Sequence, residues 1–259
     1  MNFQIDLSGK TALVTGGGHG VGETTSEMLA SVGARVLVND YYPERAESVA
    51  DKIRTTGAAA EPLPFDVTDF DAVHRALDGE SVDILVNNAG NAGTSNLTLN
   101  LFHESPRDEW DRFVGVNFFG PMNCVHACAP HMIQANWGRI ITVVSDAGRW
   151  GEPRLAVYAA SKAGAAGFTR AIARELGRYM ITANNIALGS MNTFGGLSTD
   201  REMTPEDQEA QKQRLRPYII RRIGEPEDPA ALITFLASPL SSWITGQTYP
   251  VNGGYTVNQ

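Results

Sequence analysis

Short apolar runs alternate with longer amphipathic segments along the whole chain. The apolar runs predict strands at 11–15, 35–39, 60–65, 83–87, 139–144, 181–187 and 247–251. The segments between them predict helices at 23–32, 43–55, 69–77, 106–135, 157–179 and 226–237. This alternation predicts an α/β fold, a doubly wound parallel sheet with helices on both faces. Neither a repeat nor a linker divides residues 1–259, so we expect a single domain.

One long irregular segment, 189–216, follows the sixth predicted strand. Connections of this length in compact domains are usually binding loops or lids, and less often plain disorder. Ligands of open parallel sheets bind beyond the carboxyl ends of the strands, where this segment emerges. We therefore expect it to form a substrate loop.

Composition excludes several classes of protein. The 259 residues carry a net charge of −8, which argues against a sequence-independent grip on nucleic acid. No apolar run approaches the ~20 residues that span a bilayer, and the first residues lack the pattern of a secretion signal. We expect a cytoplasmic protein that binds neither nucleic acid nor membrane. Cys124 and Cys128 share a helix face near His126 and His131, but we favour a buried helix over a metal site.

A glycine-rich loop follows the first predicted strand, at 15–22. Glycine lets the backbone turn tightly and approach a pyrophosphate, and the following helix N-terminus favours anions. The alternative is a tight strand-to-helix turn without a ligand, but the loop lies at the first strand-to-helix junction, as dinucleotide binding requires. The candidate cofactor-binding residues here are Gly16, Gly18, His19, Gly20, Val21 and Gly22.

Asp40 ends the second predicted strand, roughly 20 residues beyond the loop. A carboxylate there accepts hydrogen bonds from the adenosine ribose and repels a 2′-phosphate. Tyr41, rather than Arg, follows it, so we predict NAD and regard NADP as the less favoured cofactor. Asp40 could instead cap the next helix. Asp66 and Val67, after the third strand, are candidates to flank the adenine, although Asp66 could also be only a helix cap.

Four polar residues can form a proton-transfer site. Tyr158 and Lys162 are four apart on a predicted helix and share a face. A nearby ammonium, like a cationic nicotinamide, lowers the pKa of a phenol and so suits it to acid–base catalysis. Ser145 ends the fifth strand, where it can hold a substrate oxygen, and Asn117 can hold a water that feeds protons towards Lys162. Taken singly, each residue has a structural explanation. The Tyr158–Lys162 pair could be a solvated helix face, Ser145 could cap a turn, and Asn117 could satisfy a buried backbone group.

The conjunction of these motifs resembles the short-chain dehydrogenase/reductase family over nearly the whole chain. The matching pieces include the glycine loop, 87–90 (Asn-Asn-Ala-Gly), Asn117, Ser145, the Tyr-x-x-x-Lys pair and 252–254 (Asn-Gly-Gly). The resemblance implies a Rossmann fold, a homotetramer, and catalytic roles for Asn117, Ser145, Tyr158 and Lys162. It also implies that the cofactor contacts Tyr158 and Lys162 and the following residues: Asn88, Ala89, Gly90, Gly189, Met191 and Thr193.

Two positions depart from the family pattern. Leu188 stands where proline is usual before Gly189, and it lacks the fixed φ of proline, so we expect a more mobile turn. Asp146 follows Ser145 where a small residue is common, and it either adds a negative charge near the site or caps the turn.

The resemblance implies an oxidoreductase that interconverts a secondary alcohol and a ketone. The expected substrate contacts are Ser145, Ala147, Trp150, Leu155 and Tyr158, with Ala92 and Gly93 nearby. Trp150 and Leu155 suggest a cyclic or steroid-like skeleton, whereas Arg149 and Arg154 would suit the anionic tail of a hydroxyacyl thioester. The alternatives are a 3-oxoacyl thioester reductase, against which Asp40 counts, and a non-catalytic NAD-binding scaffold.

Overall fold

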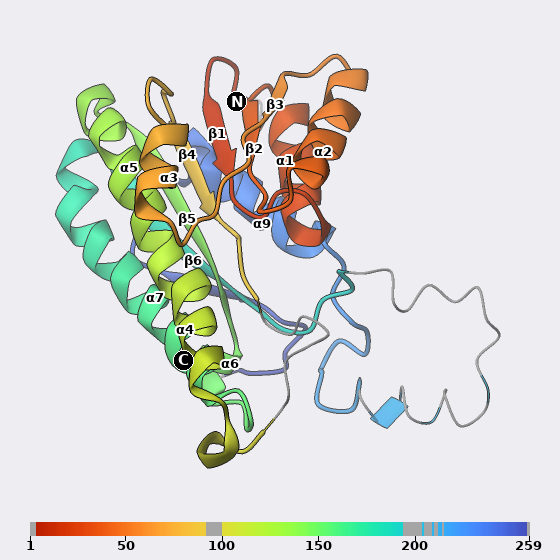
Figure 1. The fold of residues 1–259 in the computed structure, drawn as a ribbon. Coiled ribbons are helices and arrows are strands. Elements are labelled where there is room, and N and C mark those ends of the chain that lie inside the picture. Colours follow the sequence, from red (N-terminus) through yellow and green to blue (C-terminus); the bar gives the residue numbers. More distant parts are fainter. Residues whose placement is uncertain are drawn as a thin grey trace.

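A parallel sheet runs through the centre of the molecule (Figure 1). The computed structural model describes residues 4–91, 100–193, 204, 209, 212–213 and 215–257. Within these residues the strand order is β3-β2-β1-β4-β5-β6-β7, and every neighbouring pair is parallel. The strands are β1 (Thr11–Val14), β2 (Arg35–Val38), β3 (Ala60–Pro62), β4 (Ile84–Asn87), β5 (Gly138–Ser145), β6 (Ile181–Leu188) and β7 (Thr248–Val251).

Helices cover both faces of this sheet, as the alternation of the sequence predicts. One face carries α1 (Gly20–Ser31), α2 (Pro43–Thr55) and α9 (Glu227–Ala237). The other face carries α3 (Phe70–Ala76), α4 (Arg107–Val114), α5 (Gly120–Ala135) and α7 (Ala156–Leu176). The predicted fold class, a doubly wound α/β domain of Rossmann type, is confirmed.

Alternation along the strands builds a separate core on each face. In β1, Ala12 and Val14 pack with α1 and α2, whereas Leu13 packs with the opposite layer. Side chains of a strand alternate between faces, so a strand covered on both faces is apolar throughout. Burying a leucine-sized side chain contributes about 1.5–3 kcal/mol, which makes these two cores the main source of stability.

Most predicted element boundaries lie within one or two residues of the observed ones. β3 ends at Pro62 rather than at 65, because Pro62 and Pro64 have no N–H to donate to a ladder. α1 begins at Gly20, three residues before the prediction, because the glycine loop itself turns into the helix.

The predicted helix 106–135 consists of three parts. A π-helical turn, η2 (Gly115–Phe119), separates α4 from α5. Helical periodicity does not reveal such a turn, because the side chains on both sides of it remain apolar on one face. The predicted helix 157–179 divides into α7 and a 3-10 turn, η3 (Gly177–Tyr179). Three short elements of the described residues were not predicted: η1 (Phe102–Glu104), α6 (Ala147–Trp150) and η4 (Pro239–Ser241).

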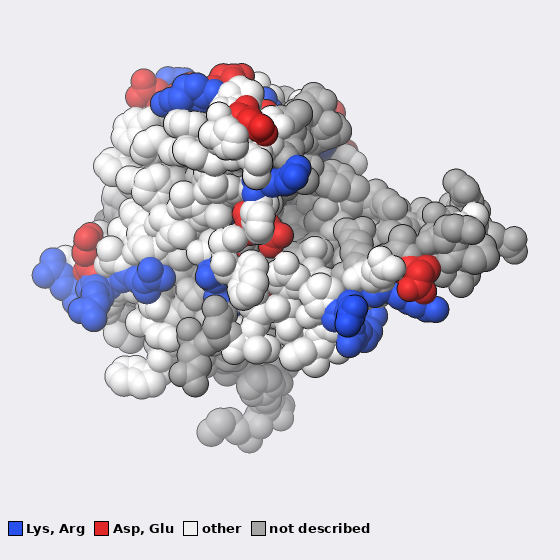
Figure 2. Space-filling view, turned by 90° about the horizontal axis from the view of Figure 1, so that it is seen from below, with Lys and Arg blue, Asp and Glu red and all other residues white. Residues whose placement is uncertain are grey.

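The topology places a crevice at the carboxyl ends of the strands. The chain runs outward from β1 to β3 and then crosses to β4 on the other side of β1, so the strand order reverses between β1 and β4. Open α/β sheets bind ligands at such a switch point. Figure 2 views the molecule from this end, where the Lys and Arg side chains of the described residues lie in small groups, mostly towards the edges of the view, with Asp or Glu side chains beside them.

Candidate active site

The glycine loop forms a cradle that excludes side chains. A Cβ at Gly22 would overlap the carbonyl oxygen of Gly16. A Cβ at Gly16, which has φ +60°, would lie 2.9 Å from the Cα of Ala89. The loop leads directly into the N-terminus of α1, whose free N–H groups favour an anion. This close-packed backbone fits the pyrophosphate of a dinucleotide.

Two distant segments close on this cradle. The Asn88 amide donates to the carbonyl oxygens of Thr15 and Gly16, both at 3.0 Å, and the Ala89 N–H donates to Thr15 Oγ1 at 3.1 Å. A Cβ at Gly20 would lie 3.1 Å from the Cβ of Thr193. The structure therefore brings together residues that the sequence marked from three separate regions. Val21 is buried on the first turn of α1.

Asp40 lies at the end of β2, with its side chain turned to the cradle. Its carboxylate accepts hydrogen bonds from the Gly18 N–H at 3.2 Å and the Tyr42 N–H at 3.0 Å, and His19 Nδ1 lies 3.7 Å away. Burial would raise the pKa of Asp40, but the hydrogen bonds from His19 and these amides hold it below its ordinary value. The carboxylate is thus ionised at neutral pH. Tyr41 is exposed beside it.

Asp66 and Val67, the residues expected to flank the adenine, lie between β3 and α3. Asp66 accepts hydrogen bonds from the N–H and hydroxyl of Thr68, while Asp69 caps α3, so the capping role considered for Asp66 belongs to Asp69. Val67 is buried in the core of that face.

Gly189 and Met191 continue from β6. Gly189 donates to the Val251 carbonyl at 3.3 Å, and Met191 bridges to Gly224. Leu188, in place of proline, pairs with both Ser145 and Val251. The turn that was expected to be mobile is therefore held by hydrogen bonds on both sides.

Ser145, Tyr158 and Lys162 meet at the carboxyl end of β5. The Ser145 side chain acts on the Tyr158 phenol closely enough to lower its pKa, and the Lys162 amine lies 5.9 Å from the centre of the Tyr158 ring. Lys162 Nζ donates to the Val143 carbonyl at 2.9 Å. Tyr158 and Lys162 are 5% and 4% exposed, which excludes their reading as a solvated helix face.

Burial sets the ionisation of this pair. It raises the pKa of Tyr158 to about 12, against a smaller lowering by the hydrogen bond with Ser145, and lowers the pKa of Lys162 to about 8. The expected lowering of the Tyr158 pKa by the Lys162 ammonium is not found: burial raises this pKa, and only the interaction with Ser145 opposes the rise. The phenol needs a further positive charge to become acidic near neutral pH.

Asn117 lies in the π-helical turn and is almost fully buried. Its side-chain nitrogen donates to the Phe113 carbonyl at 3.0 Å and to the side-chain oxygen of Asn91. A Cβ at Gly90 would lie 3.1 Å from Asn117 Oδ1 and 3.3 Å from Lys162 Nζ, so both atoms border the same glycine. Sequence reasoning missed Asn91, because its contact depends on the π-helical turn.

The second departure, Asp146, is buried in a charged network. Its carboxylate pairs with Arg149 Nη1 at 2.9 Å and accepts from the Asn252 amide. Arg149 also donates to Thr256 Oγ1 at 3.1 Å. The charge beside Ser145 is therefore balanced, and Arg149 is held within the protein rather than extended towards a substrate tail.

The predicted substrate contacts lie in and after α6, the short helix that follows Ser145. Ala147 and Leu155 pack around Tyr158 and Phe113, and Trp150, the last residue of α6, is 63% exposed. Ala92 and Gly93 lie outside the described residues, as does most of the 189–216 segment.

Other sites suggested by the sequence or the surface lie elsewhere. Cys124 and Cys128 are buried in the core, and burial raises the pKa of Cys124 to about 12. Nearby, His126 contacts His74 and His131 lies 3.8 Å from Asp83. In the described part of the chain, no three His, Cys, Asp or Glu side chains group to hold a metal ion.

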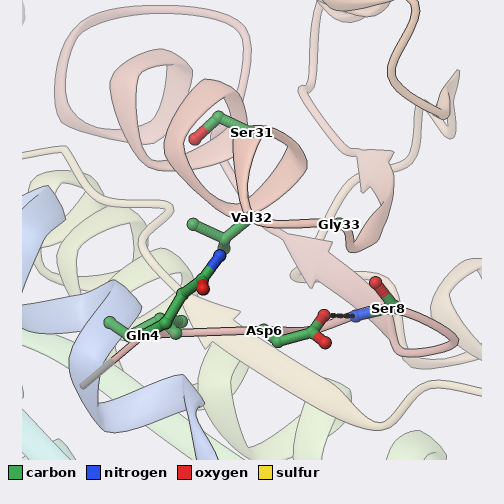
Figure 3. Close-up of a pocket in the computed structure, with 7 residues that line it drawn as sticks. Gln4, Asp6, Ser8, Ser31, Val32 and Gly33 are labelled. Atoms are coloured by element: carbon green, nitrogen blue, oxygen red, sulfur yellow. Dashed lines mark hydrogen bonds between the residues drawn. The ribbon is translucent and has the colours of Figure 1, made fainter. Parts of the chain in front are cut away.

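A hollow of about 730 Å³ is lined by Gln4, Ile5, Asp6, Ser8, Ser31, Val32 and Gly33. Figure 3 shows this hollow in close-up. It lies at the amino ends of β1 and β2, at the edge of the sheet opposite the residues described above. We therefore do not assign this hollow to the cofactor or the substrate. None of the helices that the structure describes has the length and apolarity to span a bilayer.

Comparison with known proteins now defines the class. The short chain dehydrogenase family model matches residues 10–203. The chain is 36% identical to the 3-oxoacyl-(acyl-carrier-protein) reductase FabG of Pseudomonas aeruginosa, over 96% of this chain and 98% of that protein. It is 33% identical to the enzyme of the same name from Thermotoga maritima, over 97% and 99%. The chain belongs to the short-chain dehydrogenase/reductase family and is an oxidoreductase.

Solved structures agree with this assignment. A 3-oxoacyl-(acyl-carrier-protein) reductase from Brucella melitensis with bound NAD superimposes with a TM-score of 0.87 at 32% identity, covering 98% of this chain and 94% of that one. A 7α-hydroxysteroid dehydrogenase, solved with NADH and 7-oxo glycochenodeoxycholic acid, gives 0.86 at 33% identity, covering 98% and 97%. Family and fold, both predicted from the sequence, are confirmed.

Proposed function

We propose that the protein uses NAD to interconvert a secondary alcohol and a ketone, with Tyr158 as the acid–base group. The observation that carries the proposal is that Ser145 meets the buried Tyr158 and Lys162 at the carboxyl edge of the sheet, the edge at which the glycine loop follows β1. Burying a phenol and an amine together is costly, and a non-catalytic scaffold has no need of it.

Asp40 supports NAD over NADP. The carboxylate is ionised and faces the glycine loop, so it can accept a hydrogen bond from a ribose hydroxyl and would repel a 2′-phosphate. The Brucella relative was solved with NAD, which is consistent with this preference. Gly16 and Gly22 would carry the pyrophosphate, and the segments at Asn88–Gly90 and Gly189–Thr193 would border the nicotinamide half.

The residues of the chain would divide the proton chemistry between them. When bound, the nicotinamide supplies the hydride acceptor or donor and, when oxidised, a positive charge. Ser145 would hold the substrate oxygen by a hydrogen bond, and Tyr158 would take or give its proton. Lys162 would stabilise the phenolate of Tyr158, and Asn117 would hold a water on the path towards Lys162. The further charge that Tyr158 needs explains why proton transfer should wait for the cofactor.

The substrate class divides into two candidates. The apolar side chains of Ala147 and Leu155 beside Tyr158, with the exposed Trp150 on α6, support a cyclic or steroid-like alcohol, and one structural relative was solved with 7-oxo glycochenodeoxycholic acid. The second candidate is a 3-oxoacyl thioester, which the FabG relatives favour by name. Asp40 would make such a reductase depend on NADH.

Three further proposals complete the account. Residues 1–259 would act as one domain with a substrate loop at about 189–216. The protein would assemble as a homotetramer, as the family resemblance implies. It would work in the cytoplasm, without a nucleic-acid or membrane partner.

A panel of substrates tests the proposal. NAD⁺ reduction is followed at 340 nm with secondary alcohols, hydroxysteroids and 3-hydroxyacyl thioesters, and NADH oxidation with the matching ketones. We expect turnover in one class and none with the Tyr158→Phe variant. Silence across the whole panel, together with tight NADH binding, would favour the scaffold reading instead.

A further inference from the structure

Asn91 is the side chain that holds the Asn117 amide from outside the helix. The Asn91 side-chain oxygen accepts from Asn117 Nδ2, and the Asn91 backbone N–H donates to Asn117 Oδ1 at 3.4 Å. Asn91 follows directly after Gly90, the residue that lies against both Asn117 and Lys162. One residue therefore grips both ends of the amide at the point where the β4 loop meets the π-helical turn.

Two backbone carbonyl groups show which side-chain atom of Asn117 and of Asn91 is the nitrogen and which is the oxygen. Asn117 Nδ2 lies 3.0 Å from the Phe113 carbonyl, and Asn91 Nδ2 lies 3.0 Å from the Arg112 carbonyl. A carbonyl oxygen only accepts hydrogen bonds, so the atom facing it must be the amide nitrogen in both cases. Both assignments follow from the network and agree with each other.

This orientation has a consequence at Lys162. With its nitrogen bound to Phe113 and Asn91, Asn117 presents its oxygen to Gly90, which also borders Lys162 Nζ. An oxygen on that side favours the charged form of the amine through its partial negative charge, whereas an NH₂ group would oppose it. A flip of the Asn117 amide would therefore weaken the support that Lys162 gives to the Tyr158 phenolate.

We propose that Asn91 is a positioning residue, which orients the Asn117 amide with its oxygen towards Lys162. The inference rests on the proposed function, because it assigns a role within the same proton path. The groups that face Tyr158 and Lys162 are the Ser145 hydroxyl and Val143 carbonyl on β5, the Phe113 ring on α4 and Asn117 on η2. The charged pair beside Ser145, Asp146 with Arg149, is bonded to Asn252 and Thr256.

The test compares Asn91→Ala with a structural control, Asn184→Ala. Asn184 is a buried asparagine whose amide also joins backbone groups, donating to the Ile244 carbonyl at 2.8 Å and accepting from the Gln247 N–H at 3.1 Å. It lies within β6 and takes no part in the proposed site. Loss of a purely structural amide bond should lower the melting temperature in both variants.

The decisive readout is the ionisation of Tyr158 in the NAD⁺ complex, followed by NMR of ¹³Cζ-labelled tyrosine and assigned with Tyr158→Phe. We expect Asn91→Ala to move the pH midpoint upward by about half a pH unit, because one neutral hydrogen bond is worth about that much. The single-turnover rate should fall about three- to tenfold at pH 7. The dissociation constant for NADH should stay within about twofold of wild type, and Asn184→Ala should leave the midpoint in place.

An unchanged midpoint in Asn91→Ala would overturn the positioning role and leave Asn91 as packing around the π-helical turn. An equal displacement in Asn184→Ala would overturn it as well, because the effect would then be general. The activity of Tyr158→Phe distinguishes a failure of the Asn91 role from a failure of the proposed function. If that variant is inactive while Asn91→Ala matches wild type, only the present inference fails, whereas an active Tyr158→Phe removes the proposed function itself.

Discussion

Replacing Asp40 by asparagine tests the basis of cofactor choice, because the two side chains have nearly the same shape and differ in charge. In the structure Asp40 is 3% exposed and ionised, and it faces the glycine loop. A hydrogen bond from a ribose hydroxyl to a charged acceptor contributes about 1.5–3 kcal/mol. Its weakening should reduce NADH affinity about 10- to 100-fold.

The same change removes a repulsion against NADPH. Two unit charges about 4 Å apart repel by about 4 kcal/mol at an effective dielectric constant of about 20, and by less where salt screens them. We therefore expect the wild-type protein to bind NADH at least about 100-fold more tightly than NADPH. In Asp40→Asn the two affinities should come within about tenfold.

Fluorescence titration of both nucleotides, at low and at physiological salt, measures these affinities. Asp69→Asn is the matched control, because it makes the same change of charge at another aspartate. Asp69 is the N-cap of α3, and asparagine caps helices well. It should leave the ratio unchanged. Tighter binding of NADPH by the wild-type protein, or an unaltered ratio in Asp40→Asn, would refute the role given to this carboxylate.

Three further changes have definite outcomes. Gly22→Ala should abolish NADH binding measured by calorimetry, because the added methyl group overlaps the Gly16 carbonyl, and binding within twofold of wild type would argue against the cradle. Asp146→Asn should lower the free energy of unfolding in urea by about 1–3 kcal/mol by leaving Arg149 without its charged partner, and an unchanged midpoint would contradict the network. Lys162→Met should abolish turnover but raise the free energy of unfolding by about 1–2 kcal/mol at pH 7. The folded pKa of Lys162, about 8, lies below its unfolded value of 10.5, so charging the buried amine costs stability below pH 8. The stability that Lys162→Met gains should therefore vanish as the pH rises from 8 to 10.5. A gain that is constant with pH would contradict the role of burial.

Periodicity was sufficient for the fold because the central strands are covered on both faces. The apolar run of β1 divides between two cores, as is typical of a parallel sheet covered by helices on both sides. The boundaries that differed depend on backbone hydrogen bonds instead. β3 stops at Pro62 for lack of a donor, and the π-helical turn around Asn117 changes the bonding register without changing the apolar pattern.

The motifs marked residues that the fold brings together, but they did not predict the state of the side chains. Sequence spacing placed Tyr158 and Lys162 on one face, whereas only the fold shows that both are buried, and burial reverses the expected direction of the Tyr158 pKa. Asn91 was not singled out from the sequence, and Asn252 was noted only as part of a family motif, without its contact, for a related reason. Their partners, Asn117 and Asp146, lie 26 and 106 residues away, and those contacts depend on tertiary structure.

The most direct test of the central claim is the single-turnover rate of Tyr158→Phe beside its affinity for NADH. The variant removes one oxygen atom from a buried site and leaves the glycine cradle intact. We expect the rate of alcohol oxidation at 340 nm to fall by at least about 100-fold, the lower end for loss of a general base, with NADH affinity within about threefold of wild type. A variant that turns over at the wild-type rate would contradict the assignment of the proton to this phenol.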